Sequence, residues 1–172
     1  YSLAPSSDAA VALARSFTRK GENDKAVSYY LNAAELAETD KEKEEIYIKL
    51  AKLSLVNKSY AKVREYARKA IAVNANNGEA YILIGDAYAA SAPSCGSGDL
   101  GRAGVYLVAV DKYAKAKSVD ASVAAKATEK INKYSAYFPD KETAFFKGIN
   151  NGDSYRVGCW IGESTVVRTT GG

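Results

Sequence analysis

The sequence contains no histidine and no methionine, and its 172 residues include only three prolines and two cysteines. Without histidine, the chain has no Ser/His or Cys/His nucleophilic pair, no imidazole general base and no histidine-containing metal site. We therefore expect a protein that is not an enzyme and that has no metal site and no cofactor. Because the chain starts at Tyr1 and lacks methionine, we also expect an upstream segment to have been removed.

Long apolar runs are absent too, since none approaches the ~20 residues that a membrane-spanning helix needs, and no membrane span is expected. Hydrophobic residues make up 47% of the chain and charged residues 26%, which is typical of a globular domain. The formal net charge is +4, and the basic excess is concentrated in residues 41–70. Lysine and glutamate alternate there as on a solvated helix face, so no nucleic-acid partner is expected.

Small and apolar residues recur three and four positions apart over the first 138 residues, a pattern that predicts helices. Part of this pattern repeats at an offset of 34 positions, in the pairs Tyr47 and Tyr81, Leu50 and Ile84, and Ala51 and Gly85. An internal repeat of this length predicts stacked helix pairs. Small residues let two helices approach closely, and large residues fill the space beside them.

These positions resemble the tetratricopeptide repeat, in which helix A carries an aromatic residue, Leu, Gly or Ala and Tyr, and helix B carries Ala, an aromatic residue and Ala. Three units fit the pattern, over residues 7–40, 44–77 and 78–121. Capping helices are expected over residues 122–147. The resemblance implies an all-α fold, a right-handed α-α superhelix, that occupies residues 1–147.

Two details of this helical region are also predicted. The third unit has an inserted loop between its helices, and Asp99 at the end of the loop is expected to cap the next helix. The last capping helix is expected over residues 141–147, where Phe145 and Phe146 should pack back on the fold.

Residues 148–172 differ in character and are expected to form a tail with a β-hairpin, or an extended tail, packed on the helices. Ser154–Ile161 and Ser164–Thr169 are rich in aromatic and β-branched residues, and Gly162-Glu163 between them predicts a two-residue turn. A lone hairpin is marginal in water, so we expect the side chains of Tyr155, Trp160 and Val167 to pack on the helices.

The two cysteines, Cys95 in the inserted loop and Cys159 in the hairpin, allow two interpretations. A disulfide would close a 64-residue loop and imply an oxidising compartment, whereas two free thiols would suit a cytoplasmic protein. The tail from Ser154 to Arg168 also resembles that of bacterial tetratricopeptide-repeat proteins of the cell envelope. We therefore expect a periplasmic or envelope location, with the cytoplasm as the alternative.

The resemblance also implies a binding surface, because helix A residues between the packing positions face a concave groove in this family. Carried over one by one, these positions are Val11, Arg15, Ile48, Lys49, Lys52, Leu55, Glu79, Ile82, Leu83 and Asp86. Exposed apolar side chains and cations there indicate a peptide or a partner protein. The carboxylate-clamp subtype is excluded, because Val11 and Ile48 stand where it needs lysine.

The expected function is therefore that of a non-enzymatic scaffold that binds a peptide or protein in the groove. One alternative is a structural module that pairs with a second copy through the hairpin edge or the end of the solenoid. In another, the chain's own tail fills the groove.

Overall fold

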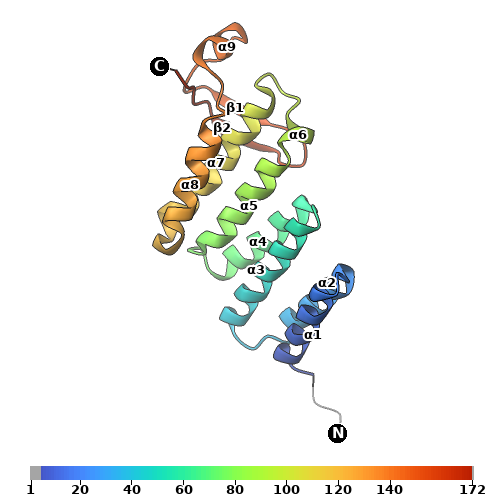
Figure 1. The fold of residues 1–172 in the computed structure, drawn as a ribbon. Helices are drawn as coiled ribbons and strands as arrows, with labels where there is room; N and C mark the ends of the chain where they lie inside the picture. The colour runs from blue at the N-terminus through green and yellow to red at the C-terminus, as the bar shows by residue number, and fades with distance from the viewer. Residues whose placement is uncertain (1–4, 172) are drawn as a thin grey trace. The chain divides into compact units, whose positions relative to one another are not determined.

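The computed structural model describes residues 5–171, which form consecutive α-helices followed by a short antiparallel hairpin (Figure 1). The fold is thus all-α with a C-terminal hairpin, as predicted. The chain divides into two compact units, Tyr1–Ala75 and Asn76–Gly172. Residues 148–171 of the tail belong to the second unit, on whose helices the hairpin packs.

The N-terminal unit contains two helix pairs, formed by α1 (Ser7–Arg19) with α2 (Asn23–Leu36) and α3 (Asp40–Val56) with α4 (Tyr60–Val73). Local sequence sets where the helices begin. Ser6 caps α1 by accepting a hydrogen bond from the Ala9 amide, and Thr39 with Glu42 forms a capping box on α3. Alanines fill most of the core between the pairs, as the small-residue pattern predicts.

The C-terminal unit comprises the elements α5 (Gly78–Ala90), α6 (Ala92–Cys95), α7 (Gly101–Val119), the 3-10 helix η1 (Ala121–Val123), α8 (Ala124–Ser135), α9 (Lys141–Phe146), β1 (Ser154–Val157) and β2 (Glu163–Val166). Helix α7 is its central element, since it packs against α5, α8 and both strands. It also contacts α6 and η1, so these six elements are positioned by their contacts with α7.

Close packing of α5 on α7 depends on a small residue facing a large one. A Cβ atom added to Gly85 would lie 2.5 Å from Cε1 of Tyr113, so only glycine leaves room for that ring. Tyr113 is fully buried, and its hydroxyl donates a 2.8 Å hydrogen bond to Oδ1 of Asp86. The Tyr113 ring therefore cannot move aside to make room for a side chain at position 85.

The inserted loop between α5 and α7 is ordered, and it contains the short helix α6. A disulfide joins the buried Cys95 at the end of α6 to Cys159 in the tail. Asp99 does not cap α7, so that prediction is wrong: Leu100 is the N-cap residue and makes no side-chain bond. Asp99 instead lies inside a tight turn closed by the hydrogen bond from the Gly101 amide to the Gly98 carbonyl.

The hairpin pairs β1 with β2 in the register Ser154 to Val166 and Val157 to Glu163. Residues 158–162 connect the strands, so the predicted two-residue turn at Gly162-Glu163 is wrong. The connection is longer because it reaches the helices: Cys159 is bonded to Cys95, and Trp160 Nε1 donates a 3.1 Å hydrogen bond to Ser91 Oγ. Cys159 adopts a left-handed conformation with φ of 60°.

Large side chains of the tail pack on the helices, as predicted. The Tyr155 hydroxyl accepts a 3.3 Å hydrogen bond from the Leu100 amide, and Val167 is buried beside Leu100 and Leu107. Two ion pairs of 2.8 Å, Lys112 with Glu163 and Arg168 with Asp111, add charged contacts between the tail and α7.

The expected packing of α9 is wrong. Phe145 and Phe146 are exposed, and the small Ala144 occupies the buried position of this short helix. Within residues 5–171, none of the helices is both long enough and apolar enough to cross a membrane.

We predict that Gly85→Val lowers the free energy of unfolding by about 2 kcal/mol or more, because the new side chain overlaps the immobile Tyr113 ring. Urea unfolding followed by circular dichroism measures this loss. Gly158→Val is the matched control, since an added Cβ there meets no atom within 4 Å. Equal losses in the two variants would contradict the packing account.

We predict that replacing both Cys95 and Cys159 by serine lowers the free energy of unfolding by up to about 4 kcal/mol, because the disulfide closes a 64-residue loop in the unfolded chain. Denaturant unfolding with and without a reductant measures the effect. Reduction should destabilise the wild type and leave the serine variant unchanged. An unfolding curve of the wild type that does not respond to the reductant would argue against the bond.

Candidate functional site

Helices α1 and α3 of the N-terminal unit line two neighbouring depressions. The small cleft has a volume of about 100 Å³ and lies between α1 residues that include Val11 and Arg15 and α3 residues that include Ile46 and Lys49. The large pocket has a volume of about 450 Å³ and is lined by Thr18, Gly21, Asn23, Tyr30, Lys49, Lys52, Leu53 and Val56. Lys49 belongs to both, so the two depressions are contiguous.

Helical spacing explains why these side chains share one surface. On α3, Ile46, Lys49, Leu53 and Val56 follow one another at intervals of three or four positions, and Lys52 stands three positions after Lys49 and four before Val56, which places them on one helix face. Four predicted groove residues, Val11, Arg15, Lys49 and Lys52, meet here. Ile48 and Leu55 are half-buried and line neither depression.

The large pocket combines an apolar floor with a positive rim. Tyr30 and Leu53 are buried at its base, whereas Val56 is exposed at its edge. Lys49 and Lys52 line it, and none of its lining residues is acidic. Within the part of the chain that the structure describes, Lys49 makes no ion pair. The pocket therefore suits a ligand that carries an apolar group and a negative charge.

The polar groups at the other side of the large pocket already have partners. Thr18 Oγ1 donates a 2.9 Å hydrogen bond to the Ala14 carbonyl, and Asn23 Nδ2 donates one of 2.5 Å to Asn57 Oδ1. The Thr18 bond lies within α1, and the Asn23 bond joins the start of α2 to the end of α3. The shape of the pocket is therefore held by the N-terminal unit itself.

The four groove residues predicted in the C-terminal unit are engaged in contacts within the fold. Ile82 and Leu83 are 0% and 4% exposed, so the prediction that they present an apolar surface is wrong. Their helix, α5, is mostly apolar and is buried on most sides. Glu79 accepts a 3.0 Å bond from Lys126 of α8, and Asp86 accepts one of 2.7 Å from Lys130 of α8.

Asp86 is the centre of the polar contacts between α5, α7 and α8. Its Oδ1 accepts hydrogen bonds from both the Tyr113 hydroxyl and the Lys130 ammonium group. Burial, and then the negative charge of Asp86, raise the pKa of Tyr113 well above its ordinary value. The arrangement stabilises the helix packing and offers no open position to a substrate.

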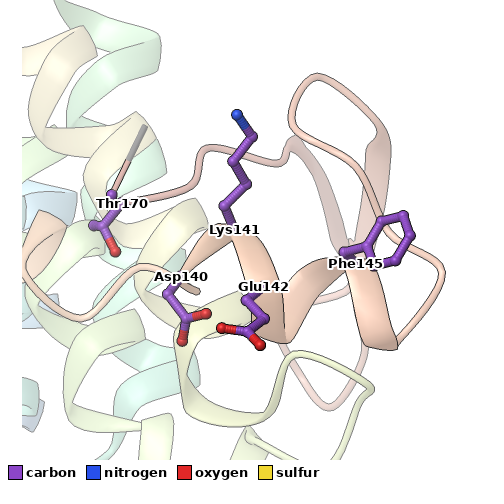
Figure 2. A pocket seen from close by; sticks show the side chains of 6 residues that line it. Asp140, Lys141, Glu142, Phe145 and Thr170 are labelled. Atoms are coloured by element: carbon purple, nitrogen blue, oxygen red, sulfur yellow. The ribbon is translucent and has the colours of Figure 1, made fainter.

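A further hollow, which the sequence analysis missed, lies beside α9 in the C-terminal unit. Its volume is about 650 Å³, and Asp140, Lys141, Glu142, Phe145, Thr170 and Gly171 line it (Figure 2). Asp140 caps α9 through hydrogen bonds from the Thr143 amide and hydroxyl, which lower the pKa of Asp140. In Figure 2 the carboxylates of Asp140 and Glu142 lie side by side, whereas Lys141 extends away from them.

No constellation for metal binding occurs in residues 5–171, where His, Cys, Asp and Glu side chains nowhere gather in a group of three. Comparison of the chain with protein-family models and with curated proteins finds no match. The features that bear on function are therefore the α1–α3 depressions and the hollow beside α9.

We predict that Tyr113 makes stability depend on alkaline pH. The folded chain keeps this hydroxyl protonated, so its contribution is complete below pH ~10 and is lost as the unfolded chain ionises above it. Between pH 9 and 11 the wild type should lose about 1.4 kcal/mol more unfolding free energy than Tyr113→Phe. Urea unfolding at both pH values measures the difference, and identical losses would contradict it.

Proposed function

We propose that this protein is a non-enzymatic interaction scaffold of the tetratricopeptide-repeat kind, which binds a peptide or protein segment on the α1–α3 surface of its N-terminal unit. The observation that carries the proposal is the contiguous small cleft and large pocket, which share Lys49. Arg15 lines the small cleft together with Asp8, Glu42 and Glu45, whereas Lys49 and Lys52 line the large pocket without an acidic neighbour in its lining, so the positive charge is concentrated in the large pocket. An acidic segment with apolar side chains is the ligand that complements it.

The repeat pattern supports this assignment. The 34-residue offset relates Ala51 of α3 to Gly85 of α5, and both positions are buried where paired helices approach. In such a fold the packing positions are occupied by small and large residues, and the side chains between them are free to vary with the partner. Arg15, Lys49 and Lys52 stand between the packing positions.

The contacts of α8 support placing the partner on the N-terminal unit. In the C-terminal unit, Lys126 and Lys130 of α8 occupy the carboxylates of Glu79 and Asp86. A ligand would have to displace these pairs before it could reach α5. On the α1–α3 surface, neither Arg15 nor Lys49 forms an ion pair with another described residue, so a ligand that binds these two side chains breaks no ion pair of theirs.

An oxidising compartment fits the disulfide between Cys95 and Cys159, since such bonds persist outside the reducing cytosol. We therefore include a periplasmic or envelope location in the proposal. Thiol alkylation of protein taken directly from its native source tests the location. Complete modification of both cysteines without prior reduction would contradict it.

The binding proposal is tested by affinity capture with a chain that carries Lys49→Glu and Lys52→Glu. We expect this variant to lose a partner that the wild type retains, because the reversed charges repel an acidic segment. Lys41→Glu with Lys43→Glu is the matched control, since it makes the same change in net charge on α3 at positions that line neither depression. Equal retention by all three chains would contradict the proposed surface.

A further inference from the structure

The three most exposed large apolar side chains of residues 5–171 are Phe146, Val56 and Phe145, at 76%, 75% and 70% exposure. Val56 forms the edge of the large pocket on the N-terminal unit. The two phenylalanines project from α9 on the C-terminal unit, and their ring centroids are 6.2 Å apart. Exposed aromatic side chains of this size, next to one another, mark an interaction surface.

The exposed surface of α9 has a defined composition and a fixed orientation. Glu142, Phe145 and Phe146 stand at positions i, i+3 and i+4, so they share one side of the helix, and we call them the α9 knob. Ala144 is buried on the opposite side, and the Asp140 cap fixes the start of the helix. The aromatic rings are therefore held outward by the fold.

The α9 knob and the large pocket are both partly apolar, and Glu142 of the knob and Lys49 of the pocket carry opposite charges. The knob carries a carboxylate, Glu142, which forms no ion pair with any residue from 5 to 171, and two exposed aromatic rings. The pocket carries Lys49 and an apolar floor, and no acidic residue lines it. Its volume of about 450 Å³ lies within the range of pockets that hold drug-sized groups.

We propose that the α9 knob of one copy of this chain inserts into the large pocket of a second copy, with Phe145 and Phe146 on the apolar floor and Glu142 beside Lys49. This inference rests on the proposed function, because it names a partner for the same binding surface. The two surfaces differ, so the contact is heterologous, and each added copy presents a new knob or a new pocket. Such contacts build either closed assemblies, in which every knob and pocket is occupied, or open filaments.

The contact is small, so we expect weak, reversible association that is detectable at ~10 µM to 1 mM chain. The first experiment is sedimentation velocity over this range with two variants. The knob variant carries Phe145→Ser and Phe146→Ser, and the pocket variant carries Lys49→Glu and Val56→Glu. Except for the half-buried Lys49, these positions are exposed, so the substitutions leave no internal cavity.

We expect the average mass of the wild type to rise with concentration and each variant alone to remain a monomer, with association weakened about 30-fold or more. An equimolar mixture of the two variants should form a two-chain complex and nothing larger, because it contains one intact knob and one intact pocket per pair. The control variant Leu13→Ser with Val166→Ser removes exposed apolar side chains elsewhere and should associate like the wild type.

A second experiment reverses the charges. Glu142→Lys alone and Lys49→Glu alone should each weaken association roughly three- to tenfold, and the two together in one chain should restore it. Restoration is specific to a direct contact between these side chains, because a loss of folding in either variant would not be repaired by the other.

Wild type that is monomeric at 1 mM overturns the inference, and so does association that survives in the knob variant. A mixture of the variants that forms no complex also overturns it. These outcomes are separable from failure of the proposed function. If the knob variant still captures another protein and Lys49→Glu with Lys52→Glu abolishes that capture, then the binding surface stands and only its occupant is wrong.

Discussion

The close approach of α5 to α7 through Gly85 is the contact on which the C-terminal unit depends. Because glycine leaves room for the ring, Tyr113 lies fully buried between the helices and directs its hydroxyl to Asp86. Asp86 then accepts the ammonium group of Lys130, which ties α8 to α5. Helix α7, held in this way, packs against both strands of the hairpin, and the disulfide joins the connection between the strands to α6. The absence of a side chain at Gly85 therefore allows the packing of α5, α7 and α8 and, through α7, of the tail.

The functional difference between the two units follows from these contacts. In the C-terminal unit, lysines of α8 neutralise the carboxylates of α5, and the apolar side chains of α5 are buried. In the N-terminal unit, the equivalent face of α3 borders a small cleft of mixed charge and a large pocket that carries positive charge. The same kind of helix face is thus covered by α8 in the C-terminal unit, on α5, and is open to a partner in the N-terminal unit, on α3.

The sequence patterns correctly predicted the features that depend on the spacing of residues close together in the chain. The helix pairs, the buried small residues and the hairpin follow from periods of 3.6 and 2 and from the 34-residue offset. The errors concern contacts between distant segments: Gly162-Glu163 resembles a tight turn, but Cys159 and Trp160 draw the connection toward α6 and α5. Phe145 and Phe146 were expected inside because they are large, yet the period of α9 places Ala144 against the fold. Four of the ten groove residues meet at the α1–α3 surface, because spacing along a helix says which side chains share a face and not which faces are covered.

The measurement that tests the account most directly is a backbone amide NMR titration of the isotopically labelled chain from dilute to concentrated solution. The account predicts shifts that are concentrated at the end of α3 around Lys49 and Val56 and on α9 around Phe145. It predicts none at Ile82 and Leu83, which lie inside the C-terminal unit. Shifts centred on α5 and α8 would contradict the assignment of the binding surface, and a spectrum that does not change with concentration would contradict the proposed occupant.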